Sequence, residues 1–218
     1  MIPTYQRPRW LERALRSVAR HAAAAAVVVV DQSDPPAELP EGVTVIRMAP
    51  GWPGPRRRVG AAALETDLIL FLDDDSELVA AFAEDRAALL ATALEEEVGL
   101  VSLPLRPGWL REPPDPVGMG GGMLVRREVY WRVGGHGSDY LDDIELSLRI
   151  RWGGWRVVRH PRPVSVHHIG AKGGLRLLPG VQPKRDAHHR LSRLDERYPD
   201  RLLRSRSSWW GFRERRGG

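Results

Sequence analysis

Leu68-Ile69-Leu70-Phe71-Leu72-Asp73-Asp74-Asp75-Ser76 is the stretch of sequence that decides the fold. Its five apolar residues are typical of a strand that is buried on both faces of a parallel sheet. Three consecutive acids follow directly. Because ligands of open α/β sheets bind beyond the carboxyl ends of the strands, this cluster suits a divalent cation that holds phosphate oxygens. The alternative is an acidic turn that caps a helix beginning near Ser76.

Predicted strands and helices alternate on both sides of this stretch. Apolar runs predict further strands at 2–4, 27–30, 43–47, 98–103, 155–158 and 164–166, and helical periodicity predicts helices at 9–25, 56–65, 76–97 and 128–133. Segment 142–152 alternates apolar and polar residues as a strand does, but its Glu, Leu and Arg content and the two glycines after it favour a helix. We therefore expect an α/β fold with a mostly parallel, doubly wound sheet flanked by helices.

The composition limits the class of protein. The chain has 218 residues, enough for one generous α/β domain, and 42% of them are apolar, enough to form a core. The lack of cysteine excludes a disulfide framework, a thiolate metal site and a cysteine nucleophile. No apolar run approaches the ~20 residues that span a bilayer, and the first residues lack the pattern of a signal peptide. We therefore expect a cytoplasmic protein.

The net charge of +5 is unevenly distributed. From Lys172 to Gly218 the chain has 13 Lys and Arg against 5 Asp and Glu, whereas the rest is slightly acidic. This basic tail, with its interleaved Trp209, Trp210 and Phe212, predicts an anionic partner, and peripheral contact with the inner face of a membrane is one candidate. The acidic body argues against nucleic acid as the main ligand. The alternative is a solvated, Arg-rich helical surface.

Short motifs along the chain occur in a recognisable order. They are Ile-Pro-Thr-Tyr-Gln-Arg from Ile2, Val-Val-Asp-Gln-Ser from Val29, the segment 57–60, Phe-Leu-Asp-Asp-Asp from Phe71, Gly-Gly-Met-Leu-Val-Arg-Arg-Glu from Gly121, Val-Gly-Gly-His from Val133, Asp-Asp-Ile-Glu-Leu-Ser-Leu-Arg from Asp142 and Val-His-His-Ile-Gly from Val166. In this order they resemble the inverting glycosyltransferases of family 2, which have the GT-A fold. The resemblance covers most of residues 2–174.

The resemblance implies a domain organisation. A GT-A domain would occupy residues 1–174, with a nucleotide-binding half at about 1–103 and an acceptor-side half at about 104–174. A basic helical extension would follow over residues 175–218. Only Met1 and Ile2 precede Pro3, whereas family members usually begin with a full strand, so the first strand is very short or the start of the chain is trimmed or misassigned.

The resemblance also implies a metal site for Mn²⁺ or Mg²⁺, because both cations favour hard oxygen ligands. Asp73 and Asp75 match the first and last acids of the family's DxD motif. Asp75 would bind the metal directly, and Asp73 would face the ribose and metal-bound water. Asp74, between them, would lie beside the nucleotide under weaker constraint. Of the two histidines after the last strand, His167 matches a metal ligand better than His168 does.

A nucleotide-diphosphate sugar is the donor that this family uses. The positions that match its binding site are Pro3, Thr4, Arg7, Asp31, Arg57, Asp73, Asp74, Gly121 and Gly122. Asp31 would accept a hydrogen bond from the N3–H of uracil or thymine, with an ordinary Asx turn as the alternative. Gly121 and Gly122 allow close approach of a ligand or fill a tight corner. Arg58 stands where the family usually has Asn, which brings a second cation to the phosphates or disturbs the pocket.

The acceptor hydroxyl needs a base, because an alcohol is a poor nucleophile while it is protonated. In the pair Asp142-Asp143, Asp143 aligns with the family's base, and the N-terminus of a helix would keep its carboxylate ionised. Helix capping is the alternative role of both acids. Attack from the face opposite the leaving diphosphate would invert the anomeric carbon.

We therefore predict a metal-dependent inverting glycosyltransferase that transfers a sugar from a UDP- or dTDP-sugar to a hydroxyl of a glycan, a lipid-linked acceptor or a secondary metabolite. One alternative keeps the GT-A fold with retaining chemistry or nucleotidyl transfer. The other is a non-enzymatic, basic protein that binds membranes or nucleic acid through its tail and whose acids are structural.

Overall fold

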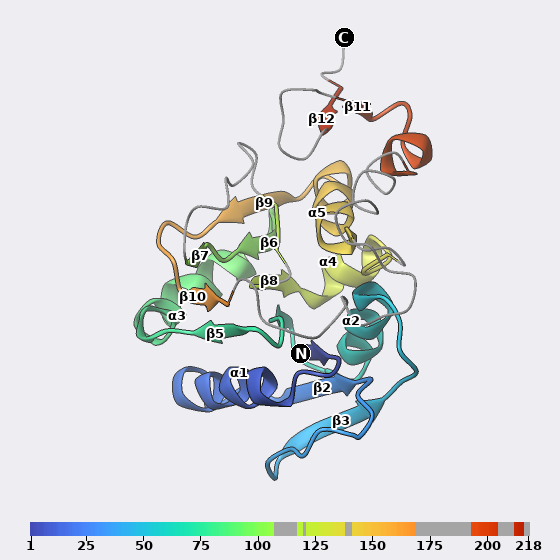
Figure 1. Cartoon of the computed structure of the whole chain (residues 1–218). Helices are drawn as coiled ribbons and strands as arrows, with labels where there is room; N and C mark the ends of the chain where they lie inside the picture. Colours follow the sequence, from blue (N-terminus) through green and yellow to red (C-terminus); the bar gives the residue numbers. More distant parts are fainter. Residues whose placement is uncertain (107–116, 120, 138–140, 169–192, 205–211, 216–218) are drawn as a thin grey trace.

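A computed structural model of the chain describes residues 1–106, 117–119, 121–137, 141–168, 193–204 and 212–215 (Figure 1). The labelled helices of this part of the chain are α1 (Pro8–His21), α2 (Pro53–Ala62), α3 (Ala80–Leu94), α4 (Arg127–Arg132) and α5 (Asp142–Trp152). The helix predicted at 142–152 is thus confirmed. Most of the acceptor-side loop expected between Arg106 and Val117, and the start of the helix expected from Pro183, lie outside the described residues.

The central sheet is mostly parallel, as predicted. Its strands are β1 (Ile2–Thr4), β2 (Val27–Asp31), β3 (Val43–Arg47), β4 (Leu68–Phe71), β6 (Val98–Ser102), β8 (Met123–Arg126) and β9 (Arg156–Arg159). Strands β1, β2 and β3 are parallel neighbours in that order. Another run has the order β4-β8-β6-β9, in which only β8 is antiparallel to its neighbours.

Met1 connects these two runs of strands. Its amino group donates a hydrogen bond to the carbonyl oxygen of Leu70 at 2.9 Å, and its carbonyl oxygen accepts one from the N–H of Leu72 at 3.2 Å. Both bonds follow the pattern of parallel neighbours, so β1 lies between β2 and β4. The carboxyl ends of β1, β2 and β4 therefore lie at the same edge of the sheet.

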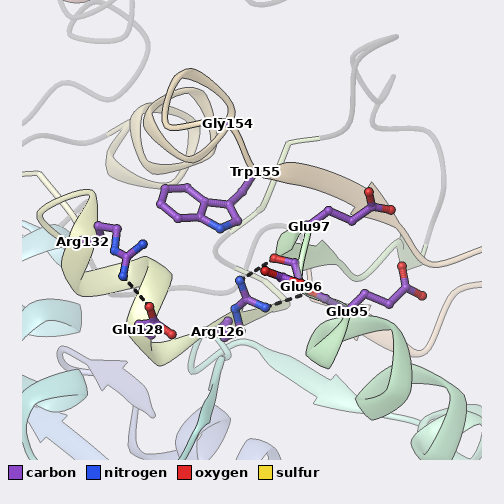
Figure 2. A pocket seen from close by; sticks show the side chains of 8 residues that line it. All are labelled: Glu95, Glu96, Glu97, Arg126, Glu128, Arg132, Gly154 and Trp155. Atoms are coloured by element: carbon purple, nitrogen blue, oxygen red, sulfur yellow. Dashed lines mark hydrogen bonds and ion pairs between the residues drawn. The ribbon is translucent and has the colours of Figure 1, made fainter.

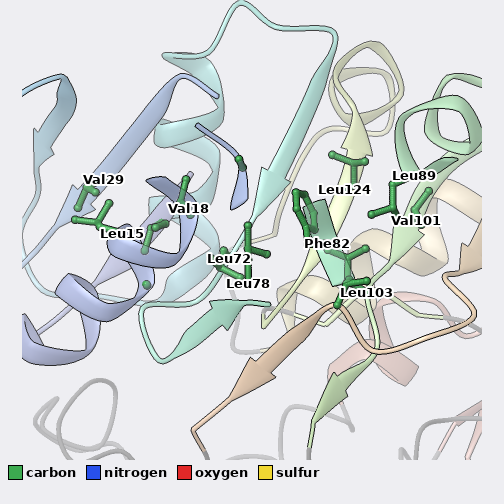
Figure 3. Close-up of a cluster of buried hydrophobic side chains, with 14 of the residues drawn as sticks. Leu15, Val18, Val29, Leu72, Leu78, Phe82, Leu89, Val101, Leu103 and Leu124 are labelled. Carbon is green, nitrogen blue, oxygen red and sulfur yellow. The ribbon is translucent and has the colours of Figure 1, made fainter. Parts of the chain in front are cut away.

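The apolar run of β4 is buried on both faces, because helices cover both sides of the sheet. Ile69 and Phe71 pack in a cluster with residues of α2, α4 and α5. Leu68 and Leu70 pack against the opposite cluster, which α1 and α3 complete. Figure 3 shows this second cluster, with side chains of α1, α3 and the sheet facing one another. The two clusters hold β4, and with it the acids that follow, in a fixed position.

A small second sheet corrects one prediction. Ser76–Leu78 is a strand, β5, and the helix that we expected from Ser76 begins only at Ala80. Strand β5 pairs antiparallel with β10 (Ser165–His167), which also pairs parallel with β7 (Leu105–Arg106). Local composition favours a helix after the acids, but the backbone groups of Ser76–Leu78 bond to β10 instead. This pairing sets Ser76 opposite His167.

The described part of the tail is only partly helical, which corrects the predicted helical extension. Residues 193–197 are helical, and Pro199 ends the helix because it cannot continue the hydrogen-bond ladder. Strands β11 (Leu202–Arg204) and β12 (Phe212–Glu214) then pair antiparallel. The side chains of Trp209 and Trp210 lie outside the described residues. None of the helices in the described ranges combines the length and apolar character that crossing a bilayer requires.

This part of the tail packs on α5. Glu145, which is 3% exposed, accepts hydrogen bonds from Arg197 at 2.9 and 3.0 Å and from the Tyr198 hydroxyl at 2.9 Å. An apolar cluster lies beside these bonds and consists of Leu141, Ile144, Leu148, Leu194 and Leu202. The described part of the extension predicted over 175–218 therefore packs against α5, the helix that begins with the predicted catalytic acids.

Candidate active site

Polar side chains meet at the carboxyl ends of three neighbouring parallel strands. Thr4 ends β1 and lies in register with Asp31, which ends β2, and the three acids follow β4 directly. The Thr4 hydroxyl donates a hydrogen bond to Asp74 at 2.8 Å across this edge. The sheet thus brings residues that are about 70 positions apart in sequence into one site, where open α/β sheets bind ligands.

Asp73, Asp75 and His167 form a group that fits a divalent cation. One ligand atom from each lies within 4.8 Å of the others, about twice a metal–oxygen bond of roughly 2.0–2.6 Å. The β5–β10 register brings His167 there, with its Nδ1 atom 3.4 Å from Asp75 and 3.0 Å from the Ser76 hydroxyl. Two carboxylates and one imidazole suit Mn²⁺ or Mg²⁺.

His168, in contrast, turns away from these acids. Its Nε2 atom contacts Glu77, and its ring lies 4.8 Å from that of Trp10. Its backbone N–H donates to the carbonyl oxygen of Asp75 at 2.8 Å. Of the two adjacent histidines, His167 therefore has the side chain that faces the acid cluster.

The three acids have different electrostatic environments. Burial opposes ionisation of Asp73, but the Arg57 guanidinium holds the pKa of Asp73 below its usual range. Burial and the charge of Asp73 raise the pKa of Asp75. Burial also raises the pKa of Asp74 to about 6, against the charge of Arg7. The crowded carboxylates thus repel one another, and a bound cation would relieve this repulsion.

Arg7 connects the middle and last acids. Its Nη1 atom donates to Asp74 at 3.0 Å and to Asp75 at 2.6 Å, and its side chain is 14% exposed. Asp74 accepts from both Thr4 and Arg7, so its carboxylate is held toward β1. Asp75 faces Arg7 with one carboxylate oxygen and His167 with the other. The predicted site residues Thr4 and Arg7 thus contact the acid cluster directly.

Arg57 is a buried bridge between two acids. Its Nη1 atom donates to both oxygens of Asp142, at 2.8 and 2.7 Å, and its Nη2 atom donates to Asp73 at 2.7 Å. Arg57 is 4% exposed, and Asp142 is fully buried at the first position of α5. Helix α2 thereby connects the acids after β4 to the N-terminus of α5.

The pair Asp142-Asp143 separates into two environments. Burial raises the pKa of Asp142 to about 7, against the charge of Arg57, and no part of Asp142 is exposed to solvent. Asp143 is partly exposed, and its Oδ1 atom accepts a hydrogen bond from the N–H of Ile144 at 2.8 Å. Asp143 therefore has a side chain that is partly accessible to solvent, whereas Asp142 is an internal ion-pair partner.

Asp31 makes the Asx turn that was the alternative to a base contact. Its Oδ1 atom accepts from the N–H of Ser33 at 2.8 Å, and its Oδ2 atom accepts from the N–H of Ala37 at 2.9 Å and from Arg47. Its carboxylate is fully buried. These contacts hold the loop after β2, and the predicted contact between Asp31 and a pyrimidine base stays a prediction.

The predicted glycines and Pro3 are buried. A Cβ atom on Gly122 would lie 3.1 Å from the Cβ atom of Leu103 and 3.3 Å from the Ser165 hydroxyl, so Gly122 fills a tight corner. Arg58 does not face the acids: its Nη1 atom donates to the carbonyl oxygen of Gly134 at 2.6 Å, and its side chain is exposed. Of the two alternatives for position 58, a second cation directed at the predicted phosphates is therefore not what the structure has.

Sequence reasoning missed two buried residues at the site. Arg56 is 4% exposed and adjacent to Arg57 in α2, and the run of three arginines at 56–58 was the only indication of it. His136 is 2% exposed, and its Nε2 atom lies 3.9 Å from Asp142. His136 was noted only as the last residue of the Val-Gly-Gly-His motif.

The buried His136 is expected to make the protein acid-sensitive. Its Nδ1 atom lies 3.0 Å from the Tyr130 hydroxyl, and its Nε2 atom has no hydrogen-bond partner among the described residues. Burial, with the charges of Arg57 and Arg149, lowers the pKa of His136 well below its usual value. The folded protein thus keeps His136 neutral while the unfolded chain binds a proton. Its contribution to stability is complete above pH ~6.5 and is lost as the pH falls below this value.

His136→Phe should therefore reduce the acid sensitivity. Between pH 7.5 and pH 5 we expect the wild type to lose about 2 kcal/mol more unfolding free energy than the variant, since each pH unit below ~6.5 is worth about 1.4 kcal/mol. Urea unfolding with EDTA at both pH values measures this. The raised pKa of Asp142 acts with the opposite sign, so the comparison of the two proteins isolates His136. Equal losses in both proteins would contradict this role.

A separate hollow lies at the opposite edge of the central sheet. It has a volume of about 720 Å³, and Figure 2 shows Trp155 above it between Arg132 and the carboxylates of 95–97. Arg126 donates hydrogen bonds to the carbonyl oxygens of Glu95 and Glu96, at 2.9 and 2.7 Å. No member of the acid cluster after β4 lines this hollow, so it is not part of the site described above.

Comparisons with known proteins identify the fold. No protein-family model matches the chain, and no curated protein matches its sequence. Among solved structures, a mannosyltransferase, PcManGT, from Pyrobaculum calidifontis in complex with GDP-Man and Mn²⁺ matches with a TM-score of 0.66 and 19% identity, over 91% of this chain and 61% of that one.

Two further solved structures agree with this match. S. aureus TarS 1–349 in complex with UDP-GlcNAc has a TM-score of 0.57 and 15% identity, over 76% of this chain and 56% of that one. GalNAc-T7 with UDP, GalNAc and Mn²⁺ has a TM-score of 0.60 and 16% identity, over 76% and 43%. The chain thus spans 61% or less of the length of these three proteins. At these sequence identities the likeness shows the fold alone: the chain has the fold of the GT-A glycosyltransferases.

Proposed function

We propose that this protein, which has the GT-A fold, is a metal-dependent inverting glycosyltransferase that transfers a sugar from a UDP- or dTDP-sugar to an acceptor hydroxyl. The observation that carries the proposal is the meeting of Asp73, Asp75 and His167 at the carboxyl end of β4. The three solved structures compared above contain a nucleotide sugar or a nucleotide, and two of them contain Mn²⁺.

In this proposal the acids and His167 would bind the metal, and two arginines hold the acids in position. Asp73, Asp75 and His167 would hold Mn²⁺ or Mg²⁺, which supplies positive charge to the diphosphate as the glycosidic bond breaks. Arg7 holds Asp75, and Arg57 holds Asp73, so both carboxylates are positioned before a ligand binds. The side chains of the site would therefore need little rearrangement when the donor binds.

Asp143 would act as the general base. It is partly exposed at the N-terminus of α5, where the helix dipole favours its ionised form. It would accept the proton of the acceptor hydroxyl, whose oxygen attacks the anomeric carbon from the face opposite the leaving diphosphate. In this proposal Asp142, which we also predicted as catalytic, would not be the base, because it is fully buried and paired with Arg57. Its role is to anchor Arg57 and the start of α5.

A thermal-shift panel of nucleotide diphosphates with Mn²⁺ tests the proposal. UDP or dTDP at about 100 times its Kd should stabilise the protein by about 2.7 kcal/mol, or roughly 5–10 °C in Tm for a chain of this size. EDTA should remove the shift, and GDP and ADP should give a smaller one. A protein whose Tm responds to none of these nucleotides would contradict the proposal. The anomeric configuration of the product, read by NMR, separates inversion from retention.

A further inference from the structure

Arg56 is a buried cation that has no acidic partner among the residues that the structure describes. It is 4% exposed, and the hydrogen bond recorded for its side chain within the described ranges runs from Nε to the carbonyl oxygen of Trp52, at a long 3.4 Å. No carboxylate of the described residues forms an ion pair with it. Its neighbour Arg57, buried to the same extent, pairs with both Asp73 and Asp142. The two arginines therefore differ in whether the protein itself satisfies their charge.

Arg56 directly precedes Arg57 in α2, and Arg57 contacts two acids of the candidate active site, Asp73 and Asp142. Burial and the charge of Arg57 lower the pKa of Arg56 to about 10, and the charges of Asp74, Asp73 and Asp142 act in the opposite direction. All three are acids of the candidate active site. Within the described part of the chain, no acid of this cluster forms a hydrogen bond or an ion pair with Arg56. A buried charge in this state is costly unless a partner completes its hydrogen bonds.

We propose that Arg56 binds the diphosphate of the donor nucleotide. This inference rests on the proposed function and adds to it a phosphate-binding residue that no motif indicated. A guanidinium presents several N–H donors in a planar fork, which matches the oxygens of a phosphate. The diphosphate would lie between the cation held by Asp73 and Asp75 and the guanidinium of Arg56. The ligand would then supply the negative partner that the described residues do not give Arg56.

Replacing Arg56 by Met should leave the stability of the ligand-free protein unchanged or raise it, and should weaken the binding of UDP. Arg56→Met removes the buried charge and keeps the unbranched side chain, so the Tm of the ligand-free protein should be unchanged or higher. Its affinity for UDP in the presence of Mn²⁺ should fall 10- to 100-fold in calorimetric titrations, whereas its affinity for uridine should change less than twofold. Arg56→Lys, which keeps the charge without the fork, should have an intermediate affinity for UDP.

Arg58→Met is the matched control, because Arg58 is exposed, follows in the same helix and donates to Gly134 instead of facing the acids. It should bind UDP within twofold of the wild type. If the wild type binds UDP and Arg56→Met binds it equally tightly, the proposal that Arg56 binds the diphosphate is wrong, while the proposed function stands. Equal losses of UDP and uridine binding, or a lower Tm without ligand, would show a structural role instead. A wild type that binds no nucleotide overturns both proposals.

Discussion

Asp75→Asn is expected to abolish the stabilisation of the protein by UDP and Mn²⁺. The substitution keeps the shape of the side chain and removes the charge that faces His167 and Arg7. We expect the affinity for Mn²⁺ and the transfer activity to fall roughly 100-fold or more, the scale on which single electrostatic contacts act in active sites. Without metal, the Tm should change little, because loss of the Asp75 charge relieves its repulsion with Asp73. Titration calorimetry with Mn²⁺ and thermal shift with UDP measure both effects.

Asp74→Asn is the matched control for this prediction. Asp74 is the middle acid of the same turn, but its carboxylate accepts hydrogen bonds from Thr4 and Arg7 and is not part of the metal-binding group. The variant should keep most of its affinity for Mn²⁺. If Asp74→Asn and Asp75→Asn lose equal affinity for Mn²⁺, the total negative charge of the acid cluster, rather than the position of Asp75, attracts the cation.

Arg57→Met is expected to have the largest effect on stability. Arg57 is buried and donates three hydrogen bonds to Asp73 and Asp142, so its loss leaves the buried carboxylate of Asp142 and the partly exposed carboxylate of Asp73 without their cation. Breaking a buried ion pair in this way costs about 3–5 kcal/mol. Urea unfolding at neutral pH with EDTA should show this loss. Adding Asp142→Asn to the variant should recover part of it, because one unpaired charge is then removed.

The exposed neighbour in the same helix controls for helix propensity. Arg58→Met loses one hydrogen bond, to Gly134, and should change the unfolding free energy by only about 0.5 kcal/mol. If Arg57→Met is destabilised by no more than Arg58→Met, the bridge between Asp73 and Asp142 is not a stabilising part of the fold.

The sequence predicts those parts of the site that depend on residues close together in the chain. The run from Leu68 to Phe71 is apolar without interruption because both faces of β4 are covered, and the acids follow at once. Strand, acid cluster and their place at the sheet edge can therefore be read from one stretch. His167 was assigned by family resemblance, and the pairing of β10 with β5 gives the physical reason for its position.

The parts that the sequence does not predict depend on contacts between distant segments. Ser76–Leu78 precedes a helical pattern, and nothing nearby indicates that a strand about 90 residues later will pair with it. Whether an acid of the pair Asp142-Asp143 is buried depends on Arg57, which lies 85 positions earlier. The packing of the tail likewise depends on Glu145, whose partners Arg197 and Tyr198 lie more than 50 positions away.

Anomalous diffraction from crystals grown with Mn²⁺ and UDP tests the central claim most directly. The claim is that the acids after β4 share one cation with a nucleotide diphosphate. We predict a strong manganese peak within bonding distance of Asp75, among the side chains of Asp73, Asp75 and His167, with the diphosphate of UDP on its open side. Well-ordered UDP without a manganese peak at these residues, or a peak bound elsewhere in the chain, would contradict it.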